Sequence, residues 1–155
     1  VILRPAMTGH LLQALALPED GSAKVLLVGF GAGYMTALAA SLSRHVWAVD
    51  RYARLIREGE ARLQRLGVGN VTLRQADGLD GWPEAGLFDR IVFACSVPEI
   101  PDLLLNQLVQ GGRLAVPVVR GNDRAIVSVT LGGGILRTPF FQQVPPLTEG
   151  RAAVL

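Results

Sequence analysis

The sequence predicts an α/β fold, a doubly wound and mostly parallel sheet that closes with an antiparallel hairpin. Short apolar runs alternate with stretches of helical periodicity, which is the pattern of βαβ units. Glycines cluster at 29–33, between the first apolar run and the helical stretch after it, and the last part of the chain is rich in β-forming residues. Because 50% of the 155 residues are hydrophobic, a single domain over 1–155 can bury a core of its own.

The first half of the chain alternates helices with strands. A proline near its start and leucines at helical spacing predict the first helix, and Gly67 ends the third. The apolar run after the first helix is typical of a strand buried on both faces. In order, we expect a helix over 5–17, a strand over 24–29, a helix over 31–43, a strand over 45–50, an amphipathic helix over 54–66 and a strand over 71–75.

The second half contains one more strand–helix–strand unit and then changes its rhythm. Gly111 and Gly112 are expected to end the helix of that unit, and three glycines at 132–134 separate two β-rich segments. We expect a strand over 88–94, a helix over 98–109, a strand over 113–118, and a hairpin of strands over 124–131 and 135–141.

Charge, cysteine count and hydropathy narrow the class of protein. The net charge of +2 is too small to indicate nucleic acid or an anionic membrane as a partner, and no apolar run reaches the ~18 residues of a spanning helix. Cys95 is the single cysteine, so no intramolecular disulfide can form. With no signal-peptide pattern at the start, we expect a cytoplasmic protein. The composition carries no information on the oligomeric state.

Residues that commonly bind metals or act as nucleophiles are few and scattered. His10 and His45 are isolated along the chain, so we expect no metal site and interpret both as structural or solvent-facing. Cys95 follows a predicted strand without a histidine partner in the sequence, and we expect a small buried hydrophobe. Trp82 is assigned to the core, with packing against the nucleotide site as the alternative.

The strongest functional motif is the loop Gly29-Phe30-Gly31-Ala32-Gly33. Glycines are needed where a backbone turns sharply or where a ligand approaches the main chain, and the start of the following helix offers free amide groups. Asp50 ends the next strand, near the offset at which an acid meets ribose hydroxyls in nucleotide-binding βαβ units. We therefore assign Gly29, Gly31, Gly33 and Asp50 to a cofactor site. Their neighbours Tyr34 and Arg51 are assigned with them.

The spacing of these glycines discriminates between nucleotides. The dinucleotide fingerprint Gly-x-Gly-x-x-Gly fails, since Tyr34 or Thr36 occupies its last place, and there is no Gly-Lys-Ser/Thr motif for a triphosphate. Gly-x-Gly-x-Gly is the form found in S-adenosylmethionine-dependent methyltransferases. A tight strand-to-helix turn without a ligand is the alternative.

Asp77-Gly78 follows the third predicted strand, at the edge of the sheet where such folds bind ligands. An acid there can accept from the exocyclic amine of adenine. Alone, Asp-Gly is an ordinary turn, but its position relative to the glycine loop and Asp50 makes Asp77 and Gly78 candidates for the same site.

A set of segments spread over the chain identifies the family. They are 25–34 (VLLVGFGAGY), 77–83 (DGLDGWP), 88–91 (FDRI), 97–101 (VPEIP), 111–114 (GGRL), 116–118 (VPV) and 144–147 (VPPL). In this order, from about Val1 to Leu147, they resemble the protein-L-isoaspartate O-methyltransferases, a family of Rossmann-like class I methyltransferases. The glycine motif is widespread among methyltransferases, whereas the GWP and PEIP segments are far more specific.

The resemblance implies methyl transfer from S-adenosylmethionine to the α-carboxylate of L-isoaspartyl residues, in the repair of damaged protein. Because a carboxylate is already nucleophilic at neutral pH, this reaction needs no strong base, and positioning and desolvation are expected to supply the catalysis. No residue is assigned as catalytic. The expected partner is a damaged protein or peptide.

The chain departs from the family pattern at two positions. The family carries an acid at the place of Leu27, and its loss is expected to reduce cofactor affinity. The family also has a Thr-Ile-Ser segment before a proline, with the serine hydroxyl near the substrate, where this chain has Val1-Ile2-Leu3-Arg4-Pro5. Leu3 cannot donate a hydrogen bond, and Arg4 can offer a charge-assisted one or face the solvent, so both are substrate-side candidates.

Alternatives to isoaspartyl methylation remain open at this point. One is a methyltransferase that uses S-adenosylmethionine on another acceptor, and the other is a non-catalytic binding module on the same fold; Leu3 and Leu27 favour both. The family has a helical region ahead of the segment at 1–5, so the chain is either a piece that lacks it or a shortened paralogue.

Overall fold

The computed structural model describes residues 3–147. Val1, Ile2 and residues 148–155 lie outside it, as do both ends of the expected domain. The elements are, in chain order, α1 (Pro5–Leu15), β1 (Lys24–Val28), α2 (Tyr34–Ser41), β2 (His45–Asp50), α3 (Ala53–Arg65), β3 (Val71–Gln75), the 3₁₀ turns η1 (Gly78–Asp80) and η2 (Pro83–Ala85), β4 (Phe88–Phe93), α4 (Asp102–Leu105), β5 (Leu108–Arg120), β6 (Asp123–Thr130) and β7 (Ile135–Pro139).

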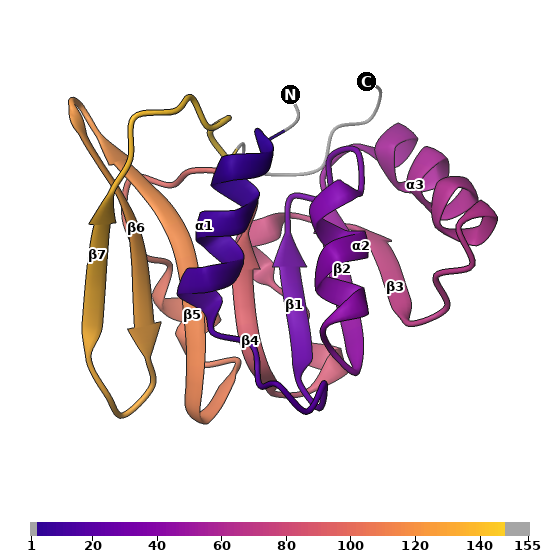
Figure 1. The fold of residues 1–155 in the computed structure, drawn as a ribbon, viewed down its shortest axis with the longest axis horizontal. Helices are drawn as coiled ribbons and strands as arrows, with labels where there is room; N and C mark the ends of the chain where they lie inside the picture. Colours follow the sequence, from indigo (N-terminus) through magenta and orange to yellow (C-terminus); the bar gives the residue numbers. More distant parts are fainter. Residues whose placement is uncertain (1–2, 148–155) are drawn as a thin grey trace.

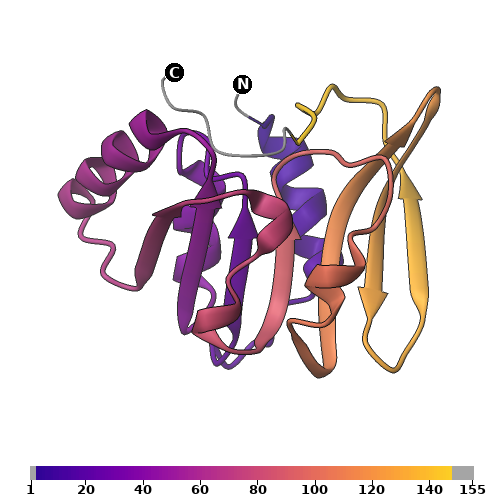
Figure 2. The same ribbon diagram turned by 180° about the vertical axis from the view of Figure 1, so that it is seen from behind.

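One sheet with helices on both faces forms the molecule (Figures 1 and 2). Its strand order is β3-β2-β1-β4-β5-β6-β7. The pairs from β3 to β5 are parallel, whereas β6 and β7 join as an antiparallel meander. The predicted fold class is confirmed. The chain progresses from β1 towards one edge and from β4 towards the other, so the order reverses between β1 and β4, where open α/β sheets bind ligands.

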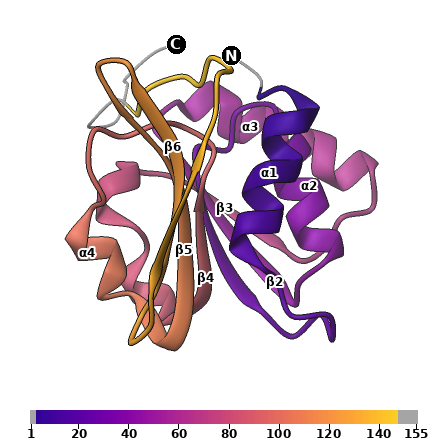
Figure 3. The same cartoon turned by 60° about the vertical axis from the view of Figure 1, so that its left-hand side comes forward.

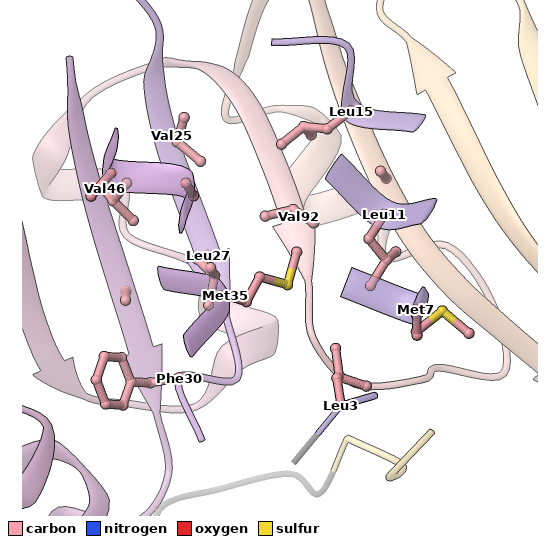
Figure 4. Packing of buried hydrophobic residues seen from close by; sticks show 14 of the residues in the cluster. Leu3, Met7, Leu11, Leu15, Val25, Leu27, Phe30, Met35, Val46 and Val92 are labelled. Atoms are coloured by element: carbon pink, nitrogen blue, oxygen red, sulfur yellow. The ribbon is translucent and has the colours of Figure 1, made fainter. Parts of the chain in front are cut away.

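The core has two parts, one on each face of the sheet. On one face Met7, Leu11 and Leu15 of α1 are fully buried, together with residues of α2 and α3 (Figure 4). On the other face Phe93 of β4 and Leu104 of α4 are fully buried, and Figure 3 shows α4 opposite the other helices. Each such side chain contributes about 1.5–3 kcal/mol of burial free energy. The sheet is therefore packed firmly between two layers of helices, one on each face.

Two arginines fix α1 against the sheet. The C-terminal carbonyl groups of a helix lack partners within the helix. Arg90 donates to the carbonyl oxygens of Leu15 (2.9 Å) and Ala16 (3.0 Å), and Arg113 donates to that of Ala14 (3.4 Å). With its C-terminal end held there, α1 begins at the edge of the sheet where β1 ends (Figure 1).

The longest described helix, α3, lies across β2 and β3. Ile56, Gly59 and Leu63 are buried, while Arg54 and Glu58 form an exposed ion pair at 2.7 Å that adds little stability. Neither this helix nor any other within residues 3–147 has the length and apolar character needed to cross a bilayer.

The helix predicted over 98–109 is wrong in extent. Only Asp102–Leu105 is helical, and Leu108 already pairs with Phe88 as the start of β5. Gly111 has a φ of 78°, which no α-helix accommodates, and it lies inside β5 instead of ending a helix. Pairing with β4 therefore overrides the local helical pattern. The helix predicted over 31–43 begins only at Tyr34, because the glycine loop precedes it.

Candidate functional site

A pocket opens at the carboxyl ends of β1, β2 and β4, on both sides of the point where the strand order reverses. Its walls come from the glycine loop, the first turns of α2 and α3, the start of α1 and the segment that returns at 145–147. The lining residues are Leu3, Thr8, Val28, Gly29, Phe30, Gly31, Ala32, Gly33, Tyr34, Met35, Val49, Asp50, Arg51, Tyr52, Leu55, Gly78, Ala94, Cys95, Pro145, Pro146 and Leu147.

The glycine loop forms the floor of this pocket. Gly29, Gly31 and Gly33 have φ values of 92°, 57° and 87°, which L side chains rarely adopt. A Cβ placed on Gly31 would meet no protein atom within 4 Å, so it would project into open space. A ligand can therefore lie directly on the main chain at Gly31.

The loop is held from behind by Phe30 and α3. Phe30 is 3% exposed, and a Cβ on Gly59 of α3 would overlap its ring. A Cβ on Gly33 would lie 2.7 Å from the same ring. Arg62 of α3 donates a hydrogen bond to the carbonyl oxygen of Ala32. These contacts let the ring fill the space between loop and helix, so that the floor is already shaped without a ligand.

Asp50 joins the loop to the end of β2. Its side chain is largely buried, with the residue 9% exposed. One carboxylate oxygen accepts from the amide of Gly31 (3.1 Å) and the other from the amide of Tyr52 (3.0 Å). A carboxylate has about four acceptor positions, so both oxygens can also take a hydroxyl of a ribose. Asp50 thus has a fixed orientation and spare acceptor capacity.

Arg51, Tyr52 and Tyr34 lie at the rim. The Arg51 guanidinium stacks over the Tyr52 ring at 5.1 Å, and its buried Nε has no hydrogen-bond partner within residues 3–147. Tyr34 begins α2 and is 49% exposed. The rim therefore offers aromatic faces and one unused cationic donor.

Of the predicted pair Asp77 and Gly78, Gly78 alone is among the residues that line the pocket. Asp77 accepts from the amide of Leu79 (3.0 Å) and caps η1, and it is not among the pocket-lining residues. Gly78 does line the pocket, and a Cβ there would lie 2.4 Å from Val28. The Asp-Gly pair thus makes a turn that brings the backbone of Gly78 close to the end of β1.

The positions that depart from the family pattern lie in different surroundings. Leu3 is 8% exposed and lines the pocket, next to Met7 at the start of α1 (Figure 4). Arg4 is exposed and is not part of the lining. Leu27 is fully buried in the core beneath α1 and α2, so it lies outside the lining as well.

Cys95 lies beside Gly29 in the floor. Burial raises the pKa of its thiol to about 12, and the nearby Asp50 carboxylate adds to this shift. A thiol with such a pKa stays neutral at physiological pH, so Cys95 is not an activated nucleophile. Its interpretation as a small buried hydrophobe agrees with this environment.

The remaining isolated residues have structural surroundings. His45 shares a hydrogen bond with Thr72 (2.8 Å), and burial together with Lys24 lowers its pKa. His10 is exposed, and Trp82 packs in the core with the Arg74 guanidinium 4.3 Å above its ring. Within the described part of the chain, no group of three His, Cys, Asp or Glu side chains could hold a metal ion.

Several lining residues escaped the sequence interpretation. Ala94 and Cys95 follow β4, so their place at the carboxyl edge was available as a signal. Tyr52 and Leu55 lie directly after Asp50, just before and in the first turn of α3, so they could have been predicted from the start of that helix. Thr8 carried no local signal, because its placement depends on how α1 packs against the sheet.

The residues present fit S-adenosylmethionine. The pocket offers a bare glycine floor at Gly31, a carboxylate at Asp50 that is fixed by two backbone amides and has spare acceptor capacity, and largely apolar walls. Two of its wall residues, Thr8 and Arg51, carry buried polar atoms without a partner among the described residues. Such atoms are unusual in folded proteins, and a bound ligand is one source of the missing partner; Thr36 and Arg74, which do not line the pocket, carry such atoms as well.

Comparisons with known proteins agree with this geometry. A family model described as protein-L-isoaspartate(D-aspartate) O-methyltransferase matches residues 1–135. The chain is similar to the protein-L-isoaspartate O-methyltransferases of Maricaulis maris (39% identical over 99% of this chain and 72% of the relative) and Paramagnetospirillum magneticum (40%, 96% and 71%). A Plasmodium falciparum protein of that description, solved with S-adenosyl-L-homocysteine, has the same fold (TM-score 0.76, 23% identical, 95% and 75% covered).

Proposed function

Because the chain belongs to the protein-L-isoaspartate O-methyltransferase family, we propose that it methylates the α-carboxylate of L-isoaspartyl residues in damaged protein, with S-adenosylmethionine as donor. It is an S-adenosylmethionine-dependent methyltransferase. The observation that carries the proposal is the pocket at the reversal of the strand order, where the glycine floor and Asp50 meet.

The donor end of the pocket is formed by the floor and the end of β2. Asp50 would hold the ribose hydroxyls, and the backbone at Gly31 and Gly33 would lie under the ligand. Tyr52, Leu55 and Gly78 would flank the base. When bound, the cofactor would supply a transferable methyl group carried on a positively charged sulfur.

The protein's contribution to the chemistry is to position the acceptor and exclude water. An α-carboxyl group has a pKa of about 3.3–3.7, so it is ionised at neutral pH and needs no base. The pocket accordingly supplies none: Cys95 is neutral, and Asp50 is engaged by two backbone amides. Apolar walls at Leu3, Met35 and Pro145 remove water from the acceptor carboxylate and make it more reactive.

The proposal extends to the setting of the reaction. Forming a methyl ester on a damaged residue would be the first step of its repair, and that residue would be part of a protein or peptide chain. We propose that this takes place in the cytoplasm, which agrees with a chain whose one cysteine is buried and unpaired.

Two measurements test the proposal. Calorimetric titration with S-adenosylmethionine should show one binding site per chain; absence of binding would favour a non-catalytic module. Formation of S-adenosylhomocysteine should then depend on an isoaspartyl peptide. If small carboxylic acids support turnover and the peptide does not, the acceptor belongs to another class and the proposal is wrong.

A further inference from the structure

The hydroxyl of Thr8 is buried without a partner. The residue is 1% exposed, and its Oγ1 makes no hydrogen bond within residues 3–147. A threonine in a helix usually returns this hydrogen bond to the carbonyl four residues earlier. Within residues 3–147 that carbonyl, of Arg4, accepts from the backbone amide of Thr8 at 3.1 Å and not from its hydroxyl. A buried hydroxyl that ignores its local partner is costly and requires an explanation.

The place of Thr8 in the pocket supplies that explanation. Thr8 and Leu3 both line the wall formed by the start of α1. Leu3 has no donor, so the hydroxyl of Thr8 is the one hydrogen-bonding side chain of this wall among the described residues. Asp50, Arg51 and Tyr52 lie together at the end of β2, and Phe30 lies on the other side of β1 from Leu3 (Figure 4).

We propose that the hydroxyl of Thr8 donates a hydrogen bond to the acceptor carboxylate and sets its orientation for methyl transfer. This inference rests on the proposed function. A carboxylate taken from water loses its hydrogen bonds and needs a donor in the pocket. A neutral donor suits the reaction, since it fixes an oxygen without the strong stabilisation that a cation would give to the ionised ground state.

The geometry of α1 supports a positioning function. Its C-terminal end is tied to the sheet through Arg90 and Arg113, and Met7 and Leu11 are fully buried on either side of Thr8. Thr8 therefore cannot shift without moving the helix. A donor held this rigidly fixes the acceptor more precisely than an exposed side chain such as Arg4 would.

Three variants test the inference. Thr8→Val keeps the shape of the side chain and removes the hydroxyl, whereas Thr8→Ser keeps the hydroxyl. Thr36→Val is the matched control, because Thr36 in α2 also carries a buried hydroxyl without a described partner and does not line the pocket. For each protein, calorimetry gives the affinity for S-adenosylhomocysteine, and steady-state kinetics with an isoaspartyl peptide give kcat and KM.

Thr8→Val should lower kcat/KM for the peptide by about fivefold to a hundredfold, the effect of one lost hydrogen bond in a transition state. Its cofactor affinity and melting temperature should not fall, since valine suits the apolar surroundings. Thr8→Ser should recover most of the lost kcat/KM, and Thr36→Val should match the parent.

Several results would overturn the inference. Parental kcat/KM in Thr8→Val would remove the hydroxyl from the reaction and leave the proposed function intact. Equal losses of kcat/KM in Thr8→Val and Thr8→Ser would mean that Thr8 acts through packing. A lower cofactor affinity in Thr8→Val would mean that Thr8 contributes to binding of the methyl donor. If the parent itself binds cofactor but does not methylate the peptide, the proposed acceptor is wrong and this role of Thr8 fails with it.

Discussion

Replacing Asp50 with alanine is the sharpest perturbation of the cofactor site. The change removes two carboxylate oxygens that hold the amides of Gly31 (3.1 Å) and Tyr52 (3.0 Å), and with them the acceptors proposed for the ribose. Hydrogen bonds to a charged group are worth about 1.5–3 kcal/mol. Since every 1.4 kcal/mol is a factor of ten, the affinity for S-adenosylhomocysteine should fall by about ten- to more than a hundredfold.

The assay is calorimetric titration of parent and variant, with the melting temperature measured on the same samples. Asp20→Ala is the matched control, because Asp20 accepts from the amide of Ser22 (3.0 Å) in a similar local turn and does not line the pocket. The control should bind as the parent does. An Asp50→Ala protein that is folded and binds with parental affinity would show that the ribose lies elsewhere and would refute this reasoning.

Three other predictions follow from the same geometry. Gly31→Val should abolish cofactor binding in a folded protein, because its side chain would occupy the pocket, while Gly21→Val, equally strained at a φ of 68° but remote from the pocket, should bind normally in the same titration. Leu3→Ser should raise isoaspartyl kcat/KM by about fivefold or more by adding a donor to the acceptor wall, and unchanged turnover would place Leu3 away from the substrate. Burial raises the pKa of the Cys95 thiol from 9.0 to about 12, so its contribution to the free energy of unfolding is complete below pH 9 and is lost as the pH rises towards 12. Urea unfolding at several pH values should therefore show a smaller fall in the free energy of unfolding between pH 9 and pH 12 for Cys95→Ala than for the parent.

Regular elements were predictable where the local pattern and the tertiary structure agree. The strands 45–50 and 71–75 have the predicted bounds: the first is mostly apolar, the second alternates apolar and polar residues from Val71 to Arg74, and both lie between clear breaks. The region 98–109 misled the prediction, since its leucines have helical spacing while the chain at Leu108 is drawn into the sheet by Phe88. Strand pairing with a segment distant in the sequence decides whether such a region is helix or strand, and the spacing of its apolar residues carries no information on that pairing.

The site was predictable to the extent that it lies at strand ends. Gly31 and Asp50 were assigned from their order along the chain, and a hydrogen bond now joins them. Asp77 is assigned by the same reasoning and stays a prediction: its carboxylate accepts from the amide of Leu79 at the start of η1, and Gly78, the next residue, lines the pocket. Which atom of a turn faces a ligand depends on backbone conformation, which residue order does not specify. Thr8 depends on how a whole helix is docked.

The most direct test of the central claim compares two peptides that are identical except for one linkage. One contains an L-isoaspartyl residue, with a free α-carboxylate, and the other an ordinary aspartyl residue at the same position. With S-adenosylmethionine present, mass spectrometry should detect one added methyl group on the isoaspartyl peptide and none on the aspartyl peptide. Equal methylation of both peptides, or no methylation of either by a protein that binds the cofactor, would contradict the account.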